Sequence, residues 1–200
     1  MLMEIKGLSK SFKNKKVLQN LDMQIAKADL ILIQGTNGCG KSTLLKIIAG
    51  LMKCDDGEII TSEPIKLGAF IENPSFIENE TALFNMQFLM ELNGKFDKEK
   101  VAALCDKFYL DLDDQTPVKK FSIGMRQKLG IIQAIMEDQN FILFDEPTRG
   151  LDKESMEIFD QLIMTLQKEE KTIIICAHDG VSNIPFNKAY KMEEGRLVEQ

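Results

Sequence analysis

The segment Gly35–Ser42, with the sequence GTNGCGKS, has the residue types and the spacing of a phosphate-binding loop. Its three glycines permit backbone conformations in which successive N–H groups point inward and form a concave site for anions. Lys41 would bring a full positive charge to the β- and γ-phosphates of a nucleoside triphosphate, and the Ser42 hydroxyl would ligate Mg²⁺. The chemistry predicted for this segment is therefore the binding of a triphosphate with its metal ion.

The flanking sequence decides between a phosphate loop and an ordinary glycine turn. Leu30–Gln34 is almost entirely apolar and predicts a buried parallel strand that runs into the loop. Lys41–Ala49 has apolar residues at helical spacing, and Gly50 is a suitable residue to end that helix. A helix that begins at the loop adds its positive dipole end to the anion site. This order of strand, loop and helix favours the phosphate loop.

Two adjacent acids follow a second apolar run. Phe141–Phe144 predicts a buried strand, and Asp145 and Glu146 come directly after it. At the carboxyl edge of a parallel sheet these acids would lie beside the phosphate loop of a neighbouring strand. Asp145 would hold the hydration shell of Mg²⁺, and Glu146, which strand alternation would point the other way, would polarise the attacking water. Without the phosphate loop, the same pair would read equally well as solvated acids after a strand.

His178 is the only histidine in the chain, and it follows the predicted strand Thr172–Ala177. A single histidine is usually incidental to function. This one is predicted to lie at the carboxyl end of a core strand, from which its side chain would reach a γ-phosphate. We therefore treat His178 as a candidate catalytic residue.

The four cysteines are widely separated and lack the spacing of a metal site, which favours free thiols in a reducing compartment. Cys39 lies inside the phosphate loop and allows two interpretations. It is a small residue at a permissive position, or it is a thiol made sensitive to oxidation by Lys41 and the nearby helix N-terminus.

The remaining sequence predicts the elements that hold these residues in place. Leu2–Leu8 and Val17–Ile25 alternate apolar and polar residues, which is typical of antiparallel strands with one exposed face. A polar turn, Lys13–Lys16, separates them. Two further short strands are predicted at Ile59–Ile60 and Leu67–Ile71.

The middle third has helical periodicity. Glu80–Leu92 and Lys98–Phe108 are predicted helices, and we interpret Asn73–Met136 as a helical insert. An amphipathic helix at Lys153–Glu169 then joins two strand patterns, an order that implies a parallel sheet. The prediction is a single α/β domain over residues 1–200. It has a P-loop NTPase core with a parallel sheet (about 1–72 and 137–200), an N-terminal antiparallel β subdomain and a helical subdomain (about 73–136).

Composition excludes several classes of protein. The chain has 200 residues, 44% of them hydrophobic, which suffices for one domain with a true core. Its net charge of −6 argues against a surface that binds nucleic acid. No apolar run approaches the roughly 18 residues needed to cross a bilayer. No signal segment opens the chain, so we expect a cytoplasmic location.

The segment Phe121–Met125, with the sequence FSIGM, resembles a variant of the L-S-G-G-Q signature of ATP-binding cassette (ABC) proteins, here opening a helix at Arg126–Met136. The intervals from Ser122 to Glu146 and from Glu146 to His178 both suit that family. Gly150–Asp152 resembles its D-loop, and the resemblance runs over nearly the whole chain.

The resemblance implies a head-to-tail homodimer that buries two ATP molecules. Ser122 and the N–H group of Gly124 would cap the γ-phosphate bound in the partner's loop, as a helix N-terminus can. His178 would be the switch residue, and Phe12 would stack on adenine. The implied signature set is Ser122, Ile123, Gly124 and Met125, with Asp152 in the D-loop. The implied nucleotide-binding set is Phe12, Gly35, Thr36, Asn37, Gly38, Cys39, Gly40, Lys41, Ser42 and Thr43. The implied metal set is Ser42, Glu72 and Asp145.

Two departures from the family pattern concern the site. Glu72 stands where the family has the Q-loop glutamine, which adds a negative charge near the phosphates. Ile123 replaces a signature glycine, but the proposed phosphate contact needs close approach only at Ser122 and Gly124. The Ile-Glu-x-Pro variant around Glu72, together with Met125, resembles the subgroup that exports peptide antibiotics, drugs or sodium.

The predicted function is that of an ATP-hydrolysing subunit that uses ATP and Mg²⁺ to power export through a separate transmembrane permease. A soluble ABC ATPase of DNA repair or of the ribosome is the alternative. The chain lacks the long coiled coil of the first kind and the second cassette of the other. A P-loop kinase is a third possibility, against which Glu146 and the Ser122 motif argue.

Overall fold

The computed structural model describes residues 1–13, 15–72, 75–178 and 180–200. Asn14 in the predicted polar turn, and Asn73 and Pro74 at the predicted start of the helical insert, lie outside the described residues. Within the described part of the chain, no helix is long and apolar enough to cross a membrane.

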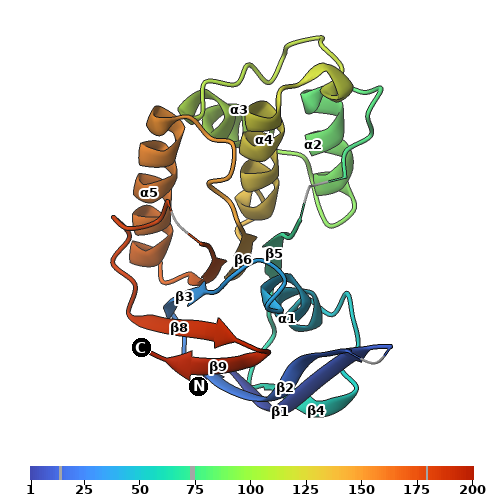
Figure 1. Ribbon diagram of the computed structural model, residues 1–200. Helices are drawn as coiled ribbons and strands as arrows, with labels where there is room; N and C mark the ends of the chain where they lie inside the picture. The colour runs from blue at the N-terminus through green and yellow to red at the C-terminus, as the bar shows by residue number, and fades with distance from the viewer. Residues whose placement is uncertain (14, 73–74, 179) are drawn as a thin grey trace.

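A six-stranded sheet forms the centre of the molecule (Figure 1), in the order β5-β6-β7-β3-β8-β9. Neighbouring strands run parallel except β9, which pairs antiparallel with β8. Apolar runs form the central strands because elements cover both faces of the sheet. The strands are β3 (Leu30–Gln34), β5 (Leu67–Phe70), β6 (Phe141–Asp145), β7 (Thr172–Cys176), β8 (Lys188–Glu193) and β9 (Arg196–Glu199).

The predicted parallel sheet is confirmed, and it contains a strand, β8, that was not predicted from the sequence. This strand alternates inward and outward side chains in its second half, where Tyr190 and Met192 are buried and Lys191 and Glu193 are exposed. The pattern is short and rich in charge, so it becomes recognisable as a strand only through its pairing with β3.

A second, antiparallel sheet has the order β2-β1-β4 and lies at the bottom of Figure 1. Its strands are β1 (Met3–Phe12), β2 (Lys15–Ile25) and β4 (Asp56–Thr61). Helix α1 (Lys41–Ile48) follows the phosphate loop, and its Leu44 and Leu45 are fully buried in a cluster with side chains of both sheets. The apolar face predicted for this helix therefore joins the two sheets.

The chain between β5 and β6 is largely helical and lies in the upper part of Figure 1. It contains α2 (Ala82–Glu91), α3 (Lys98–Lys107), the short 3₁₀ helix η1 (Val118–Lys120) and α4 (Ile123–Ile135). The prediction that the signature helix begins at Arg126 is wrong. Helix α4 begins within the motif itself, because the Ser122 hydroxyl accepts a hydrogen bond from the Met125 N–H group and caps the first turn.

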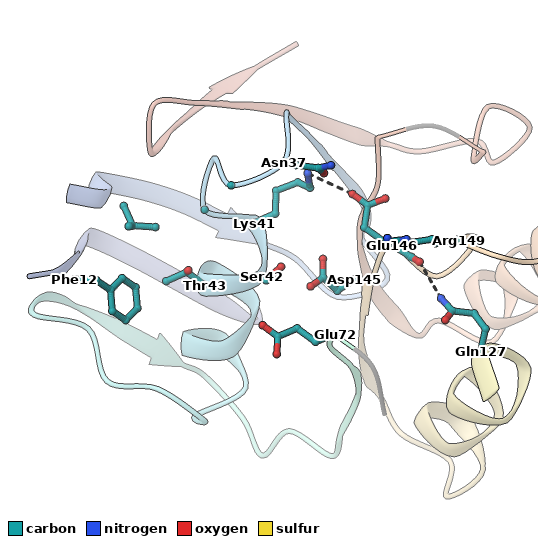
Figure 2. Close-up of a pocket in the computed structure, with 13 residues that line it drawn as sticks. Phe12, Asn37, Lys41, Ser42, Thr43, Glu72, Gln127, Asp145, Glu146 and Arg149 are labelled. Atoms are coloured by element: carbon teal, nitrogen blue, oxygen red, sulfur yellow. Dashed lines mark hydrogen bonds and ion pairs between the residues drawn. The ribbon is translucent and has the colours of Figure 1, made fainter. Parts of the chain in front are cut away.

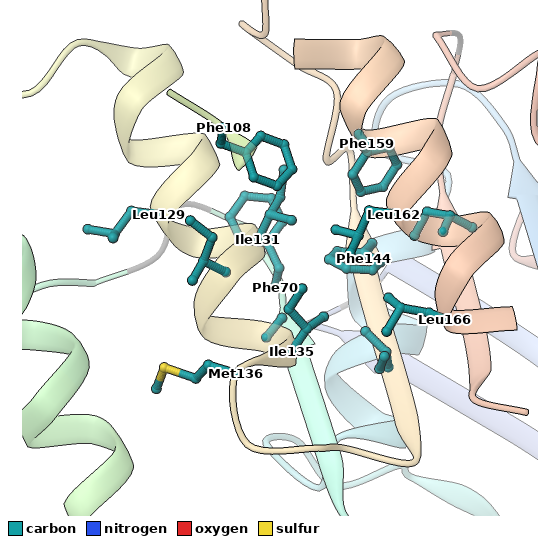
Figure 3. Packing of buried hydrophobic residues seen from close by; sticks show 14 of the residues in the cluster. Phe70, Phe108, Leu129, Ile131, Ile135, Met136, Phe144, Phe159, Leu162 and Leu166 are labelled. Atoms are coloured by element: carbon teal, nitrogen blue, oxygen red, sulfur yellow. The ribbon is translucent and has the colours of Figure 1, made fainter. Parts of the chain in front are cut away.

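Helices α4 and α5 (Lys153–Lys168) pack their apolar faces on the parallel sheet (Figure 3). The rings of Phe144 on β6 and Phe159 on α5 meet edge to face, with centroids 5.4 Å apart. Strand β5 approaches α4 so closely that a Cβ atom added at Gly68 would lie 1.8 Å from the Ala134 carbonyl oxygen. This tight core fixes α4 relative to the strands that end at the site.

Candidate functional site

The loop after β3 has the backbone geometry that its glycines predict. Gly38 and Gly40 have φ angles of 79° and 119°, in a region that other residues rarely adopt. A side chain at Gly40 would also approach the Val17 carbonyl oxygen within 2.9 Å. The Cys39 N–H group bonds to the Thr36 carbonyl at 3.2 Å and closes the loop upon itself.

Lys41 begins α1, and its side chain is 5% exposed. Its Nζ atom donates to the Gly35 carbonyl oxygen at 2.6 Å and lies 3.3 Å from Oε1 of Glu146 (Figure 2). The loop thus holds a buried cation directly opposite a carboxylate. This arrangement offers positive charge at the floor of the loop, where a phosphate would compete with Glu146 for it.

A cavity of about 660 Å³ opens beside this pair, a volume typical of sites for small ligands. Figure 2 shows the side chains that line it. The structure brings together here ten of the predicted site residues: Phe12, Asn37, Gly38, Gly40, Lys41, Ser42, Thr43, Glu72, Asp145 and Glu146. Phe12 ends β1 and is 44% exposed, so its ring is available for stacking.

Asp145 ends β6 as a buried carboxylate beside the loop. Its Oδ1 atom is buried and has no hydrogen-bond partner among the described residues. Burial raises the pKa of this carboxyl, and the charge of Glu146 adds to the rise, while Ser42 acts in the opposite direction. A buried acceptor without a partner, next to a hydroxyl, is a suitable ligand position for a hard cation.

Glu146 does not reach the cavity by strand alternation, and that part of the prediction is wrong. Strand β6 ends at Asp145, and Glu146 has a left-handed backbone with φ 49°. Its N–H group donates to the Cys176 carbonyl at 2.8 Å, while its Oε2 atom accepts from the His178 N–H group at 3.2 Å. A constrained turn, held by the last residue of β7 and by His178 beyond it, therefore directs this carboxylate toward Lys41.

His178 lies where the sequence predicts, directly beyond β7, and it is exposed. Its backbone amide contacts the carboxylate of Glu146. The two predicted catalytic residues are thus neighbours in space, as their places after adjacent strands imply.

Glu72 also has a left-handed backbone, with φ 58°, and it borders the cavity. Its carboxylate pairs with Nζ of Lys46, on α1, at 2.5 Å. This partner, which was not predicted from the sequence, balances the charge that the acid adds at the Q-loop position.

The signature residues lie outside the cavity of their own chain. Ser122 caps α4, and the side chain of Ile123 is 75% exposed beside it. A Cβ atom at Gly124 would lie 2.9 Å from the Gly150 carbonyl oxygen, so a glycine is needed here for packing within the chain. The exposed start of α4 presents its N-terminus to solvent.

Asp152 caps α5, accepting a hydrogen bond from the Ser155 N–H group at 2.8 Å. This bond lowers the pKa of the Asp152 carboxyl. Asp152 also lies 3.6 Å from Nζ of Lys128 on α4. The D-loop segment and the signature helix are therefore packed against each other in one chain.

Comparison with known proteins identifies the family. The profile of the ABC transporter family matches residues 18–149, which include the glycine loop, the start of α4 and the two acids. This chain belongs to the ABC transporter family. The lantibiotic transport ATP-binding protein SrtF of Streptococcus pyogenes is 33% identical to this cassette over 184 residues, covering 88% of it and 80% of SrtF. The aliphatic sulfonates import ATP-binding protein SsuB of Bacillus cereus is 35% identical over 195 residues, covering 90% and 76% of the two chains.

The ABC cassette fold is confirmed by solved structures. A dimeric ATP-binding cassette in a post-hydrolysis state, bound to ADP and Pi, superposes with a TM-score of 0.86. The two chains are 23% identical, and the match covers 100% of this cassette and 98% of the other. At this identity the likeness concerns the fold alone.

Two polar residues of this ABC cassette border the cavity without having been predicted, namely Gln127 and Arg149. Gln127 is 7% exposed on the buried face of α4. In the sequence it is only a polar residue in a predicted helix, and its burial, which requires a polar partner, shows only in the structure. Arg149 follows Glu146 closely in the chain, but its place at the cavity depends on the turn after β6.

Proposed function

We propose that this ABC protein binds ATP with Mg²⁺, hydrolyses the ATP, and couples hydrolysis to transport through a separate transmembrane permease. The observation that carries the proposal is the meeting of Lys41, Asp145 and Glu146 at one cavity beside the glycine loop. A fixed cation, a buried carboxylate suited to a metal ion and a second carboxylate beside them are the groups that phosphoryl transfer to water requires.

Each group has a role in this scheme. The loop N–H groups and Lys41 bind the β- and γ-phosphates, and Phe12 stacks on the base. Ser42 and Asp145 would hold Mg²⁺, and Glu72 would contribute through a water ligand. When bound, the ion would supply positive charge against the phosphate oxygens. Arriving phosphates replace Glu146 as the partner of Lys41, which leaves the carboxylate to orient water and accept its proton.

The rest of the site would come from a second copy. Ser122 and the α4 N-terminus lie outside the cavity of their own chain, where they would cap the γ-phosphate held by a partner. Two copies placed head to tail would then enclose two ATP molecules, and a monomer would hydrolyse poorly. ATP binding would shift an open–closed equilibrium, and hydrolysis would reverse it.

The direction we propose is export, at the cytoplasmic face of a membrane. The variant around Glu72 and the similarity to a lantibiotic transport protein support it. Import is the second candidate, because SsuB is similarly related and is named for sulfonate import. A soluble ABC ATPase would instead co-purify with ribosomes or DNA, and the net charge of −6 disfavours nucleic acid as a partner.

The test is Glu146→Gln, which keeps the shape of the side chain but removes the proton acceptor. We expect ATP hydrolysis to fall at least ~100-fold, the lower range for a general base. Binding of ATP should persist, and gel filtration with Mg²⁺ and ATP should show a dimer.

The matched control is Glu157→Gln on the exposed face of α5, which should hydrolyse ATP at the wild-type rate. Hydrolysis by Glu146→Gln at the rate of this control would refute the assigned chemistry. A phosphorylated acceptor molecule, formed as ATP is consumed, would favour a kinase instead.

A further inference from the structure

The buried amide of Gln127 on α4 is bonded to the backbone of the proposed catalytic turn (Figure 2). Its Nε2 atom donates to the Glu146 carbonyl oxygen at 3.0 Å and to the Pro147 carbonyl oxygen at 3.1 Å. An amide nitrogen carries two hydrogens, so both donors of this side chain are used on consecutive carbonyls.

These bonds reach a strained part of the backbone. Glu146 is a non-glycine residue with φ 49°, a conformation that persists only where its surroundings enforce it. Its remaining backbone bonds come from the strand edge at Cys176 and from the Arg149 N–H group. Gln127 is the support that comes from the helical part of the chain, and it holds the peptide that follows the carboxylate-bearing residue.

The same face of α4 also contacts two residues further along the segment after Glu146. Gly124 lies against the Gly150 carbonyl, and Lys128 lies 3.6 Å from Asp152. Ser122 stands at the start of this helix. A displacement of the Ser122 end of α4 would therefore be carried to the turn that aims Glu146.

We propose that Gln127 is a positioning residue that couples the position of the signature helix α4 to the orientation of the Glu146 carboxylate. The inference rests on the proposed hydrolysis of ATP, for which Glu146 is the water-activating group. Gln127 touches neither the phosphates nor water in this scheme. It keeps the turn in the conformation from which the carboxylate faces the loop.

Two variants test this role. Gln127→Met keeps the length and apolar stem of the side chain but removes both donors, and Gln127→Glu keeps the shape and, when ionised, also lacks them. For each we expect kcat to fall about tenfold, while the dissociation constant for ATP stays within about twofold, the pattern of a lost transition-state interaction. Tyr109→Phe is the matched control, because it removes another bond between the helical part and α5, from the Tyr109 hydroxyl to Glu154 at 2.8 Å. It should leave kcat unchanged.

A double-mutant cycle with Glu146→Gln distinguishes a residue that positions the Glu146 carboxylate from one that only stabilises the fold. Gln127→Met added to Glu146→Gln should lower the residual single-turnover rate no further, because its effect passes through that carboxylate. An equal tenfold loss in that background would overturn the inference, as would wild-type kcat in both Gln127 variants. If Gln127→Met does not fold, Gln127→Glu decides. A Glu146→Gln protein that hydrolyses normally would instead remove the proposed function itself.

Discussion

Asp29, immediately before β3, is a buried carboxylate that ties the start of this strand to the start of β8. It accepts hydrogen bonds from the Ala26 N–H group at 2.7 Å, from Nδ2 of Asn187 at 2.9 Å and from Nζ of Lys188 at 2.7 Å. Asn187 in turn accepts from the Leu30 N–H group at 2.6 Å. The network therefore anchors the strand that leads into the phosphate loop, and it can be tested by removing one charge.

Asp29→Asn keeps the size of the side chain but removes the anion that faces Lys188. A hydrogen bond to a charged group contributes roughly 1.5–3 kcal/mol to stability. The Lys188 side chain is 27% exposed, so solvent screens part of this interaction. We expect the free energy of unfolding at neutral pH to fall by about 2 kcal/mol. The new amide has only one acceptor oxygen, so it cannot replace all the hydrogen bonds that the two carboxylate oxygens accept.

The loss should also depend on pH in a definite direction. Burial alone would raise the pKa of Asp29, but the bonds from Lys188, Ala26 and Asn187 outweigh it and hold that pKa below its usual range. Stability from a carboxyl with a lowered pKa is fully present above the unfolded pKa of about 3.9 and is lost as pH falls through the folded pKa. The difference between wild type and Asp29→Asn should therefore be constant above about pH 5 and shrink at more acid pH.

Urea unfolding followed by circular dichroism, at neutral pH and near pH 3.5, measures both effects. Asp113→Asn is the matched control, because Asp113 forms an exposed pair with Lys98 at 2.6 Å and should contribute less than about 1 kcal/mol. A neutral-pH loss in Asp29→Asn as small as in this control would refute the reasoning. A difference that stays constant down to acid pH would refute the linkage to ionisation.

Two further predictions concern packing and the base of the nucleotide. Gly68→Ala should lower stability by at least ~3 kcal/mol, because the new methyl group would lie 1.8 Å from the Ala134 carbonyl oxygen; the same change at Gly94, where an added Cβ meets nothing within 4 Å, should shift the melting temperature little. Phe12→Ala should weaken ATP binding about tenfold in calorimetry through lost stacking, while Phe12→Trp keeps it. Inorganic tripolyphosphate has no base, so equal weakening of its binding would show that Phe12 acts otherwise.

The features of this protein that depend on neighbouring residues in the chain could be predicted from its sequence. The glycines of the loop directly follow the apolar run of β3, and the acids Asp145 and Glu146 directly follow the apolar run of β6. Each motif is contiguous in the chain, so backbone preferences and residue order sufficed to predict a phosphate site. The helical periodicity of α5 and the alternation in β2 predicted elements for the same reason.

The orientation of the site residues, by contrast, depends on contacts between distant segments. Glu146 faces Lys41 because a left-handed turn is held by β7 and by Gln127, and these bonds join residues far apart in the chain. The pairing of Glu72 with Lys46 and the existence of β8 likewise depend on neighbours brought near by folding. Local propensity predicts the elements that have a clear apolar pattern, whereas a charge-rich strand such as β8, the conformation of a strained residue and the partner of a buried polar group depend on which distant segments pack beside them.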